Sequence, residues 1–220
     1  MSTVPYANYE VKKNLKPKGL VGLSEKLIDQ HWSLYEGYVN NVNLLDKMVW
    51  ECLQEGRLLQ TPPFSELERR LGFEYNGMIL HEYYFGALAA GIPEPGKSSK
   101  LAQRFAKDFG SFENWKRQFS EIGKMRGIGW VTTTMDPSTQ RLINFWVTDH
   151  QLGNVSSFIP IVVMDVWEHA YILDYGAKAA GRTTYIESYL QNLNWEMIEK
   201  RMALADQSKV WPRDLTTTVA

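Results

Sequence analysis

A carboxylate and an imidazole stand four residues apart in the segment of residues 165–171, DVWEHAY. The apolar run of residues 158–164 comes directly before it and predicts a buried strand with Asp165 at its end. If the chain then turns helically, His169 projects to the same side as Asp165, and the two can share one cation. Such a donor pair suits iron, manganese or zinc. An isolated aspartate and histidine at this spacing are also common as a salt bridge or a helix cap. Large aromatic residues flank these two, however, and polar side chains among aromatic rings need a binding partner to offset the cost of desolvation.

The chain has only four histidines, so each of them can be considered in turn. His31 and His81 fall in predicted helices of the N-terminal half, whereas Asp165 and His169 follow a predicted sheet. If both halves supplied ligands, a bound cation would hold the N-terminal and C-terminal halves of the chain together. The sequence has no Glu-x-x-His, which disfavours a ferritin-like di-iron bundle, and no His-Glu-x-x-His, which disfavours a zinc protease.

Two helical patterns must position His31 and His81. After an irregular arm of residues 1–22, Ser24 is a good N-cap for a first helix that carries His31 and ends at Gly56. The second pattern follows a linker of residues 58–63 and carries His81. It is predicted in two pieces, residues 64–71 and 78–90, with a break at residues 72–77. Two long helices with a short connection predict an antiparallel hairpin.

The C-terminal half changes from helical to strand periodicity. The turn-rich segment of residues 91–96, GIPEPG, is the predicted domain boundary. The elements expected after it are helices at 99–109 and 112–124, strands at 129–134 and 141–147 around a turn, a third strand ending at Asp165, a helix at 185–205 and a tail. The predicted fold class is α+β, with a helical hairpin domain at residues 1–92 and an α/β domain at residues 93–220 that holds a three-stranded antiparallel sheet.

Composition restricts the possible partners. The net charge of −1 gives no reason to expect nucleic acid or an anionic membrane as a partner. No stretch approaches the roughly 20 apolar residues of a membrane span, and the N-terminus lacks the pattern of a secretory signal. We therefore expect a cytoplasmic protein. The single cysteine, Cys52, excludes a disulfide within the chain and a thiolate metal cluster.

Several ordered motifs resemble the iron/manganese superoxide dismutases, from residue 23 to about residue 202. The segment DVWEHAY looks like the signature of that family, YVNNVN at residues 38–43 resembles its Tyr-Val-x-x-Leu-Asn segment, and HEYYF at residues 81–85 is similar to its second-histidine motif. Further matches are FGSF at residues 109–112, GIGW at residues 127–130 and NWE at residues 194–196.

The resemblance implies a metal site and a reaction. Carried over by position, His31, His81, Asp165 and His169 would be the ligands of one iron or manganese ion per subunit, iron being slightly favoured, with solvent as a fifth ligand. In the family one superoxide reduces the metal and leaves as dioxygen, and a second reoxidises it and leaves, with two protons, as hydrogen peroxide. Superoxide would be the substrate, and the protein would be a homodimer or homotetramer.

The resemblance also implies residues around the solvent ligand. Family members place a glutamine there, either from the helix before the second histidine or from the sheet domain. Gly77 stands at the first of these positions, so we expect His150 to be the donor from the second, with Gln151 as the nearest substitute. Tyr38 would be the tyrosine that gates the substrate funnel, and Tyr35, one helical turn from His31, is the rival for that role.

Four further residues take roles from the resemblance. Trp130 and Trp167 would form the aromatic wall of the site, although plain core packing also explains them. Glu168 would reach across a dimer to the partner subunit's histidine. Arg182 would stand at the mouth of the funnel and attract an anion, or else be a solvated surface charge.

Three departures from the family pattern bear on these roles. The interval from His31 to Tyr38 is one residue shorter than in common members, so the first helix must lose a bulge or shift its register. The family's histidine near that point is absent, and Ile172 replaces a tyrosine, which suggests a rewired proton route or an altered interface. About three extra residues at 176–181 would lengthen the loop before Arg182.

The interpretation that follows is a metal-dependent superoxide dismutase. The alternatives are a dismutase-fold protein with a structural or partner-binding role and little or no activity, and a different mononuclear iron enzyme with the same ligands.

Overall fold

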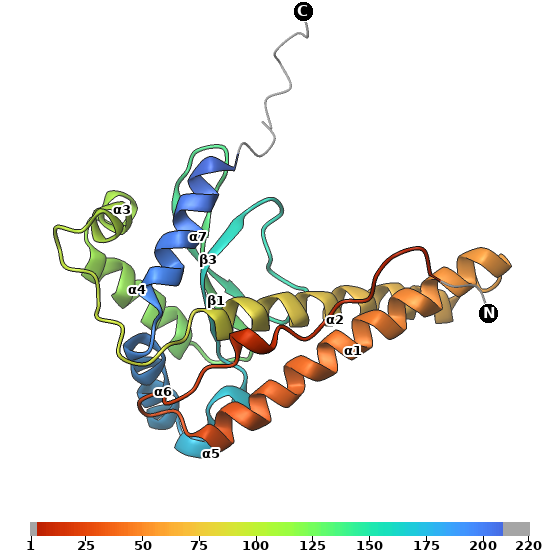
Figure 1. The fold of residues 1–220 in the computed structure, drawn as a ribbon, viewed down its shortest axis with the longest axis horizontal. Coiled ribbons are helices and arrows are strands. Elements are labelled where there is room, and N and C mark those ends of the chain that lie inside the picture. Colours follow the sequence, from red (N-terminus) through yellow and green to blue (C-terminus); the bar gives the residue numbers. More distant parts are fainter. Residues whose placement is uncertain (1–3, 209–220) are drawn as a thin grey trace, which may run out of the picture.

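Two long helices form an antiparallel hairpin in the computed structural model, which describes residues 4–208 (Figure 1). α1 spans Glu25–Glu55 and α2 spans Pro62–Gly86. The Ser24 side chain accepts a hydrogen bond from the Leu27 N–H, and Gly56, with a φ of 60°, ends α1 in the left-handed conformation that glycine adopts at low cost. The prolines at the start of α2 fit because the first helical N–H groups have no partner within the helix.

The course of α2 corrects one prediction. No break occurs at residues 72–77, because α2 continues unbroken through Gly72 and Gly77. Packing against α1 keeps these residues helical although glycine has a low helix propensity. α2 also ends at Gly86 rather than at residue 90. The Ala89 N–H instead donates to the Asn192 carbonyl, and the Asn194 N–H donates to the Ala87 carbonyl.

The predicted three-stranded antiparallel sheet is present. β1 (Trp130–Met135) is the central strand between β2 (Leu142–Val147) and β3 (Ile159–Asp165). Trp130 is directly opposite Asp165 in the register of β1 and β3. An indole and a carboxylate are therefore brought to the same end of the sheet.

The described part of the C-terminal half contains five α-helices besides the sheet, and some of them pack on it. They are α3 (Lys100–Phe109), α4 (Phe112–Lys124), α5 (Ile172–Tyr175), α6 (Ala179–Gln191) and α7 (Trp195–Gln207), with the short 3₁₀ helices η1 (Lys13–Leu15) and η2 (Glu168–Ala170) elsewhere. α4 packs on β1 and β2, while α2 of the hairpin and α7 both pack on β3. The helical and sheet halves therefore share one hydrophobic core.

One C-terminal helix predicted at residues 185–205 is in fact two helices. The chain leaves the helical conformation between α6 and α7 because Asn192 binds the N-terminal arm, accepting from the Val21 N–H and donating to the Val21 carbonyl. Asn194 then caps α7 by accepting a hydrogen bond from the Met197 N–H. The predicted tail lies almost wholly outside the described residues.

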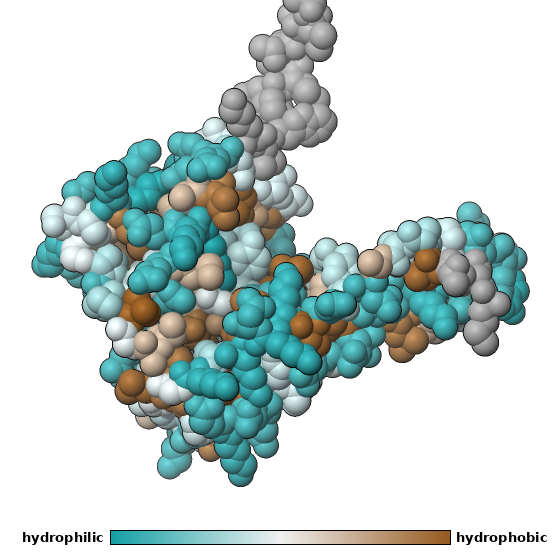
Figure 2. Space-filling view, in the orientation of Figure 1, coloured by the Kyte–Doolittle hydropathy of each residue, from teal (hydrophilic) through white to brown (hydrophobic). Residues whose placement is uncertain are grey.

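These elements confirm the α+β fold class, whereas the domain boundary predicted near residue 92 stays a prediction. That boundary falls in the segment of residues 87–99 between α2 and α3. The far end of the hairpin projects beyond the body of the molecule, and hydrophobic and hydrophilic residues alternate along its visible face (Figure 2). No helix of the described residues is long and apolar enough to span a bilayer.

Candidate metal centre

Four side chains from four separate elements converge between the hairpin and the sheet. One potential ligand atom from each of His31, His81, Asp165 and His169 lies within 4.8 Å of all the others. The Oδ2 atom of Asp165 is 3.1 Å from Nε2 of His31, 3.1 Å from Nε2 of His169 and 3.7 Å from Nε2 of His81. The residues predicted as ligands are thus the ones that the fold brings together, although their role as ligands stays a prediction.

Local structure aims each of these side chains. His31 and His81 lie on the buried faces of α1 and α2, Asp165 ends β3, and His169 lies in η2 as the predicted helical turn requires. The Trp167 N–H donates to Oδ1 of Asp165 at 2.8 Å, which leaves Oδ2 facing the histidines. Nδ1 of His81 donates to the Gly77 carbonyl at 2.6 Å, so its Nε2 keeps a lone pair toward the centre.

Neighbouring histidines keep the carboxylate of Asp165 ionised although it is buried away from solvent. Asp165 is fully buried, which by itself would raise its pKa, but the charge of His169 and the hydrogen bonds from His169 and His31 lower it overall. Burial lowers the pKa of His31 and takes the pKa of His81 well below its ordinary value. For His169, burial is outweighed by the charge and hydrogen bond of Asp165, so its pKa is raised.

This donor set fits a transition metal. Nε2 of His81 is buried and has no hydrogen-bond partner among the described residues, a costly state for a polar atom unless a cation shares its lone pair. Three neutral imidazoles and one carboxylate can bind iron or manganese and leave positions open for a substrate. The aspartate backbone is fixed as well, because the Tyr185 hydroxyl donates to the Asp165 carbonyl at 2.7 Å.

Beside the four convergent residues, Tyr38 and His150 form a short hydrogen bond. Oη of Tyr38 is 2.6 Å from Nε2 of His150, and the two rings lie 5.0 and 6.0 Å from the ring of His81. On its other side, Nδ1 of His150 accepts a hydrogen bond from the Trp130 indole N–H at 3.0 Å. Burial lowers the pKa of His150 to about 4 and, with the charges of Asp165 and Glu74, raises the pKa of Tyr38.

These contacts fix where the protons lie. An indole N–H can only donate, so Nδ1 of His150 is an acceptor without a proton. Because the imidazole is neutral, its single proton is on Nε2 and is donated to the Tyr38 oxygen. The hydrogen of the Tyr38 hydroxyl then points away from His150 and is left for another acceptor. The order of donation is therefore Trp130 to His150 to Tyr38.

The rival residues lie elsewhere. The Tyr35 hydroxyl accepts from the Lys12 N–H and donates to Glu82, so it binds the N-terminal arm rather than His150. Burial raises the pKa of Tyr35 to about 12. The Oε1 atom of Gln151 lies near Gly72, close enough to contact a side chain placed there. α1 runs through the shortened interval as a regular helix.

Trp167 also borders the centre. Its ring stacks on that of His169 with centroids 6.0 Å apart and lies 5.0 Å from the ring of His150. With Trp130, whose ring is 4.9 Å from that of His81, it forms an aromatic wall in addition to packing in the core.

Glu168 and Arg182 border a surface recess of ≈ 660 Å³ instead of the centre itself. Four basic residues line it together with Glu168 and Tyr171: Lys124, Arg126, Lys178 and Arg182. Arg182 is only 9% exposed and donates to the carbonyls of Gly123 and Gly127, so the alternative of a solvated surface charge is wrong. The lengthened loop before it is also shorter than expected, because α6 already begins at Ala179.

Two residues that position the centre were not predicted. Tyr185 supports Asp165 as described, and Gly77 gives Tyr38 its place, because a Cβ on Gly77 would be 2.6 Å from Cδ1 of Tyr38. A glycine in a helix interior is unfavourable, and this one is one turn before His81 on the same face. A glycine at that position was the signal from which its role could have been predicted.

The comparisons with known proteins agree with this geometry. A sequence model described as iron/manganese superoxide dismutases, C-terminal domain, matches residues 97–201. The superoxide dismutase [Fe] of Cupriavidus metallidurans is 37% identical over 203 residues, which cover 90% of this chain and 98% of that protein. The superoxide dismutase [Fe] of Aquifex pyrophilus is 31% identical over 89% of this chain and 92% of its own. The superoxide dismutase [Mn/Fe] of Aeropyrum pernix is 35% identical over 62% of this chain and 64% of its own.

Proposed function

The chain belongs to the iron/manganese superoxide dismutase family, and on that basis we propose that it converts superoxide to dioxygen and hydrogen peroxide at one iron or manganese ion per subunit. The observation that carries the proposal is the meeting of His31, His81, Asp165 and His169 around one point. A descendant kept only for its fold has no need for two buried imidazoles, a partly buried third and an ionised carboxylate at one point.

These four residues would hold the ion. When bound, it supplies one-electron chemistry through its +2 and +3 states, so that one superoxide is oxidised and the next is reduced. Iron is slightly favoured over manganese, and the names of the relatives, [Fe] and [Mn/Fe], support both. The protein's task is to keep His81 unprotonated at Nε2, to keep Asp165 ionised and to exclude bulk water with the rings of Trp130 and Trp167.

Tyr38 is the residue that we propose as proton donor. Reduction of one superoxide to hydrogen peroxide takes up one electron and two protons; Tyr38 would supply one proton, and solvent would supply the other and reprotonate Tyr38. The single ring proton of His150 is already donated to the Tyr38 oxygen, whereas the hydroxyl hydrogen of Tyr38 is free of that bond. His150 would therefore act on solvent and substrate mainly through Tyr38 rather than as the direct donor expected from the sequence.

The basic recess beside Glu168 would draw the anion toward the protein. Lys124, Arg126, Lys178 and Arg182 give this surface an excess of positive charge, which raises the encounter rate with superoxide at low salt. Glu168 and Ile172, four residues apart in the chain, are both exposed, and Glu168 would reach the His169 of a second copy. A homodimer or homotetramer in the cytoplasm is part of the proposal.

The decisive experiment measures turnover of superoxide by protein loaded separately with iron and with manganese. We expect activity with at least one metal, and inactivity of both fully loaded forms would refute the proposal and favour a structural role for the fold. The variant His81→Ala should lose the metal, because it removes one of three imidazoles. Stoichiometric metal in that variant, measured by elemental analysis, would contradict the assignment of ligands. Elemental analysis of the protein from its native source would identify the metal used in the cell.

A further inference from the structure

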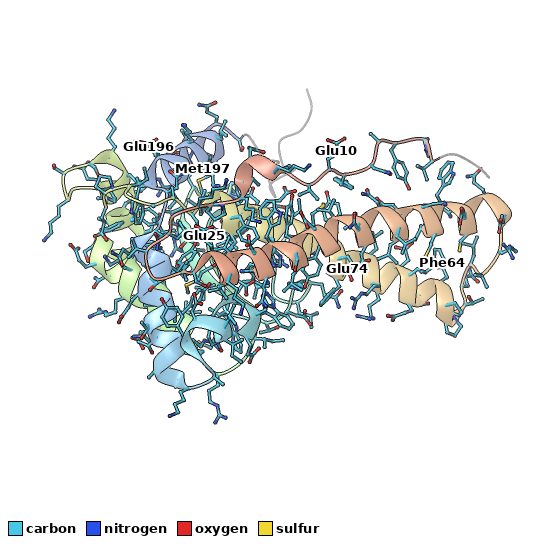
Figure 3. All side chains as sticks on the ribbon, turned by 60° about the horizontal axis from the view of Figure 1, so that its bottom comes forward. Glu10, Glu25, Phe64, Glu74, Glu196 and Met197 are labelled. Carbon is cyan, nitrogen blue, oxygen red and sulfur yellow. The ribbon has the colours of Figure 1, made fainter. Side chains whose placement is uncertain are left out.

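A stripe of residues on α2 continues beyond His81 toward the start of the helix. Gly77, Glu74, Phe73 and Arg70 follow one another at helical spacing on α2, where Figure 3 labels Glu74. Gly77 and Phe73 of this stripe contact Tyr38, and Phe73 also contacts His150. Only Gly77 and His81 of this stripe have a place in the site described so far. The remaining three carry a carboxylate, a phenyl ring and a guanidinium.

Glu74 is the unusual member, because a carboxylate with 1% exposure is rare. Its Oε1 atom is 2.5 Å from a guanidinium nitrogen of Arg70, whose side chain is 45% exposed. Both carboxylate oxygens are buried and neither has a hydrogen-bond partner among the described residues, so the contact with Arg70 is a close ion pair without hydrogen-bond geometry. A buried carboxylate without hydrogen bonds, paired with a half-exposed cation, contributes little to stability and costs desolvation, so stability alone does not explain it.

The guanidinium belongs to a row of contacts between planar groups that reaches His150. The Arg70 Cζ atom lies 4.5 Å from the centroid of the Phe73 ring, and the Phe73 ring meets that of His150 edge-on, with centroids 4.5 Å apart and the planes 61° apart. The ring of His150 also contacts that of Trp167, with centroids 5.0 Å apart. His150 is thereby in contact with one ring from α2 and one from the end of the sheet.

His150 needs such support because its backbone is irregular. It belongs to the connection of residues 148–158 between β2 and β3, which contains no helix or strand. Tyr38, by contrast, is held by α1 and by the close approach to Gly77. The short bond between Tyr38 and His150 therefore depends on what holds the imidazole in place.

We propose that Glu74, Arg70 and Phe73 form a clamp that positions His150 for its hydrogen bond with Tyr38. Glu74 fixes the guanidinium, the guanidinium lies over Phe73, and Phe73 holds the imidazole against Trp167. The three are positioning residues, since none of them is among the convergent ligand candidates. The importance of this bond for catalysis rests on the proposed function, but the clamp itself is a statement about the protein alone.

Four variants separate this role from its alternatives. Arg70→Gln removes the planar cation at a half-exposed position, where folding is not at risk. Arg70→Lys keeps the charge for Glu74 but cannot stack a planar group on Phe73. Phe73→Leu removes the ring itself. The control is Arg69→Gln, because Arg69 pairs with Glu66 on the same helix and both are exposed.

The first measurement is the ring ¹⁵N and ¹H NMR spectrum of His150 in protein loaded with zinc, which is redox-inert. We expect wild type and Arg69→Gln to show one tautomer, protonated at Nε2, with a slowly exchanging proton. Arg70→Gln, Arg70→Lys and Phe73→Leu should show averaged tautomers and an Nε2 proton that exchanges at least tenfold faster. An unchanged His150 signal in Arg70→Gln and Phe73→Leu would overturn the clamp. If Arg70→Lys alone kept the wild-type His150 signal, Arg70 would act through its charge and not by lying over the Phe73 ring. That result would also overturn the clamp.

The second measurement is turnover with the active metal. We expect kcat to fall by about tenfold in Arg70→Gln and Arg70→Lys with metal content unchanged, since small misplacements of a catalytic group have large effects. If wild type turns over superoxide while both variants match it, the clamp has no role in catalysis and that part of the inference fails. If wild type is inactive with both metals, the proposed function fails, and the NMR result alone decides the clamp.

Discussion

Replacing Gly77 with alanine tests how tightly Tyr38 is seated. A Cβ on Gly77 would stand 2.6 Å from Cδ1 and 2.8 Å from Cε1 of Tyr38. Carbon atoms pack at about 3.5–4.0 Å, so the ring has to retreat by about 1 Å. A displacement of that size is enough to break the bond between Oη of Tyr38 and Nε2 of His150, now 2.6 Å long, because side-chain contacts of about 3.6 Å are no longer hydrogen bonds.

The expected effects can be separated with a control in the same helix. Alanine is favoured over glycine in a helix by about 1 kcal/mol, and overpacking costs about 1–3 kcal/mol. At Gly72 a Cβ would meet only the Gln151 Oε1 atom, at 3.7 Å, which is ordinary contact. Gly72→Ala should therefore be as stable as wild type or more stable, and Gly77→Ala should be less stable than Gly72→Ala by about 1–3 kcal/mol.

The assays are thermal unfolding, metal analysis and turnover of superoxide. We expect Gly77→Ala to keep its metal and to lose between about tenfold and a hundredfold in kcat, the effect of moving a reacting group by about 1 Å. Gly72→Ala should keep the wild-type kcat. If Gly77→Ala matched Gly72→Ala in both stability and kcat, the argument that this glycine seats Tyr38 would be wrong.

Three further predictions follow from the same contacts. Tyr38→Phe should lower kcat and Tyr35→Phe should not, because of these two hydroxyls only that of Tyr38 is hydrogen-bonded to His150. Equal kcat values in the two variants would contradict the assignment of Tyr38 as the proton donor. In metal-free protein the pKa of His150 falls from its ordinary 6.5 to about 4 on folding, so this residue should contribute a loss of about 3 kcal/mol in folding stability as the pH falls through that window. The lowered pKa values of His31 and His81 contribute a loss of the same sign, so in urea unfolding the drop of His150→Gln should be smaller than that of wild type by about 3 kcal/mol. That variant should keep its metal and mainly change its preference between iron and manganese. Tyr185→Phe should lower the free energy of unfolding by about 1–2 kcal/mol, because the buried Asp165 carbonyl loses its hydroxyl donor; an unchanged urea midpoint would show that the bond contributes nothing.

The elements of the fold were predictable wherever local signals and packing agree. Ser24 and Gly56 bound α1 as their types predict, and strand-forming residues around a turn, followed by a continuous apolar run, predicted all three strands. The errors arose where tertiary contacts override propensity. The glycines of α2 predict a break, but α1 supplies a packing surface that keeps them helical. The break at Asn192 is held by distant parts of the chain, namely Val21 of the arm and the segment after α2.

The candidate site shows a similar division between what spacing and what packing determine. The spacing of Asp165 and His169 predicts a shared cation from general geometry, whereas the addition of His31 and His81 rested on the resemblance to the family. No pattern in the sequence predicts that Trp130 occupies one nitrogen of His150 and Tyr38 the other. That arrangement depends on the register between β1 and β3 and on the course of an irregular loop, and neither is a local property of the sequence.

The absence of a side chain at Gly77 and the choice of histidine at position 150 belong together. Glycine at position 77 leaves a space that the Tyr38 ring fills, and the filled space brings the tyrosine oxygen to 2.6 Å from the imidazole. A glutamine at position 77 would need the space that the ring occupies, so the regular, shortened course of α1 and a glutamine on α2 are incompatible in this packing. The residue that takes the place of this glutamine and hydrogen-bonds to Tyr38 must then come from the sheet side, where His150 lies. Restoring glutamine at position 77 alone should consequently displace Tyr38 rather than add a donor.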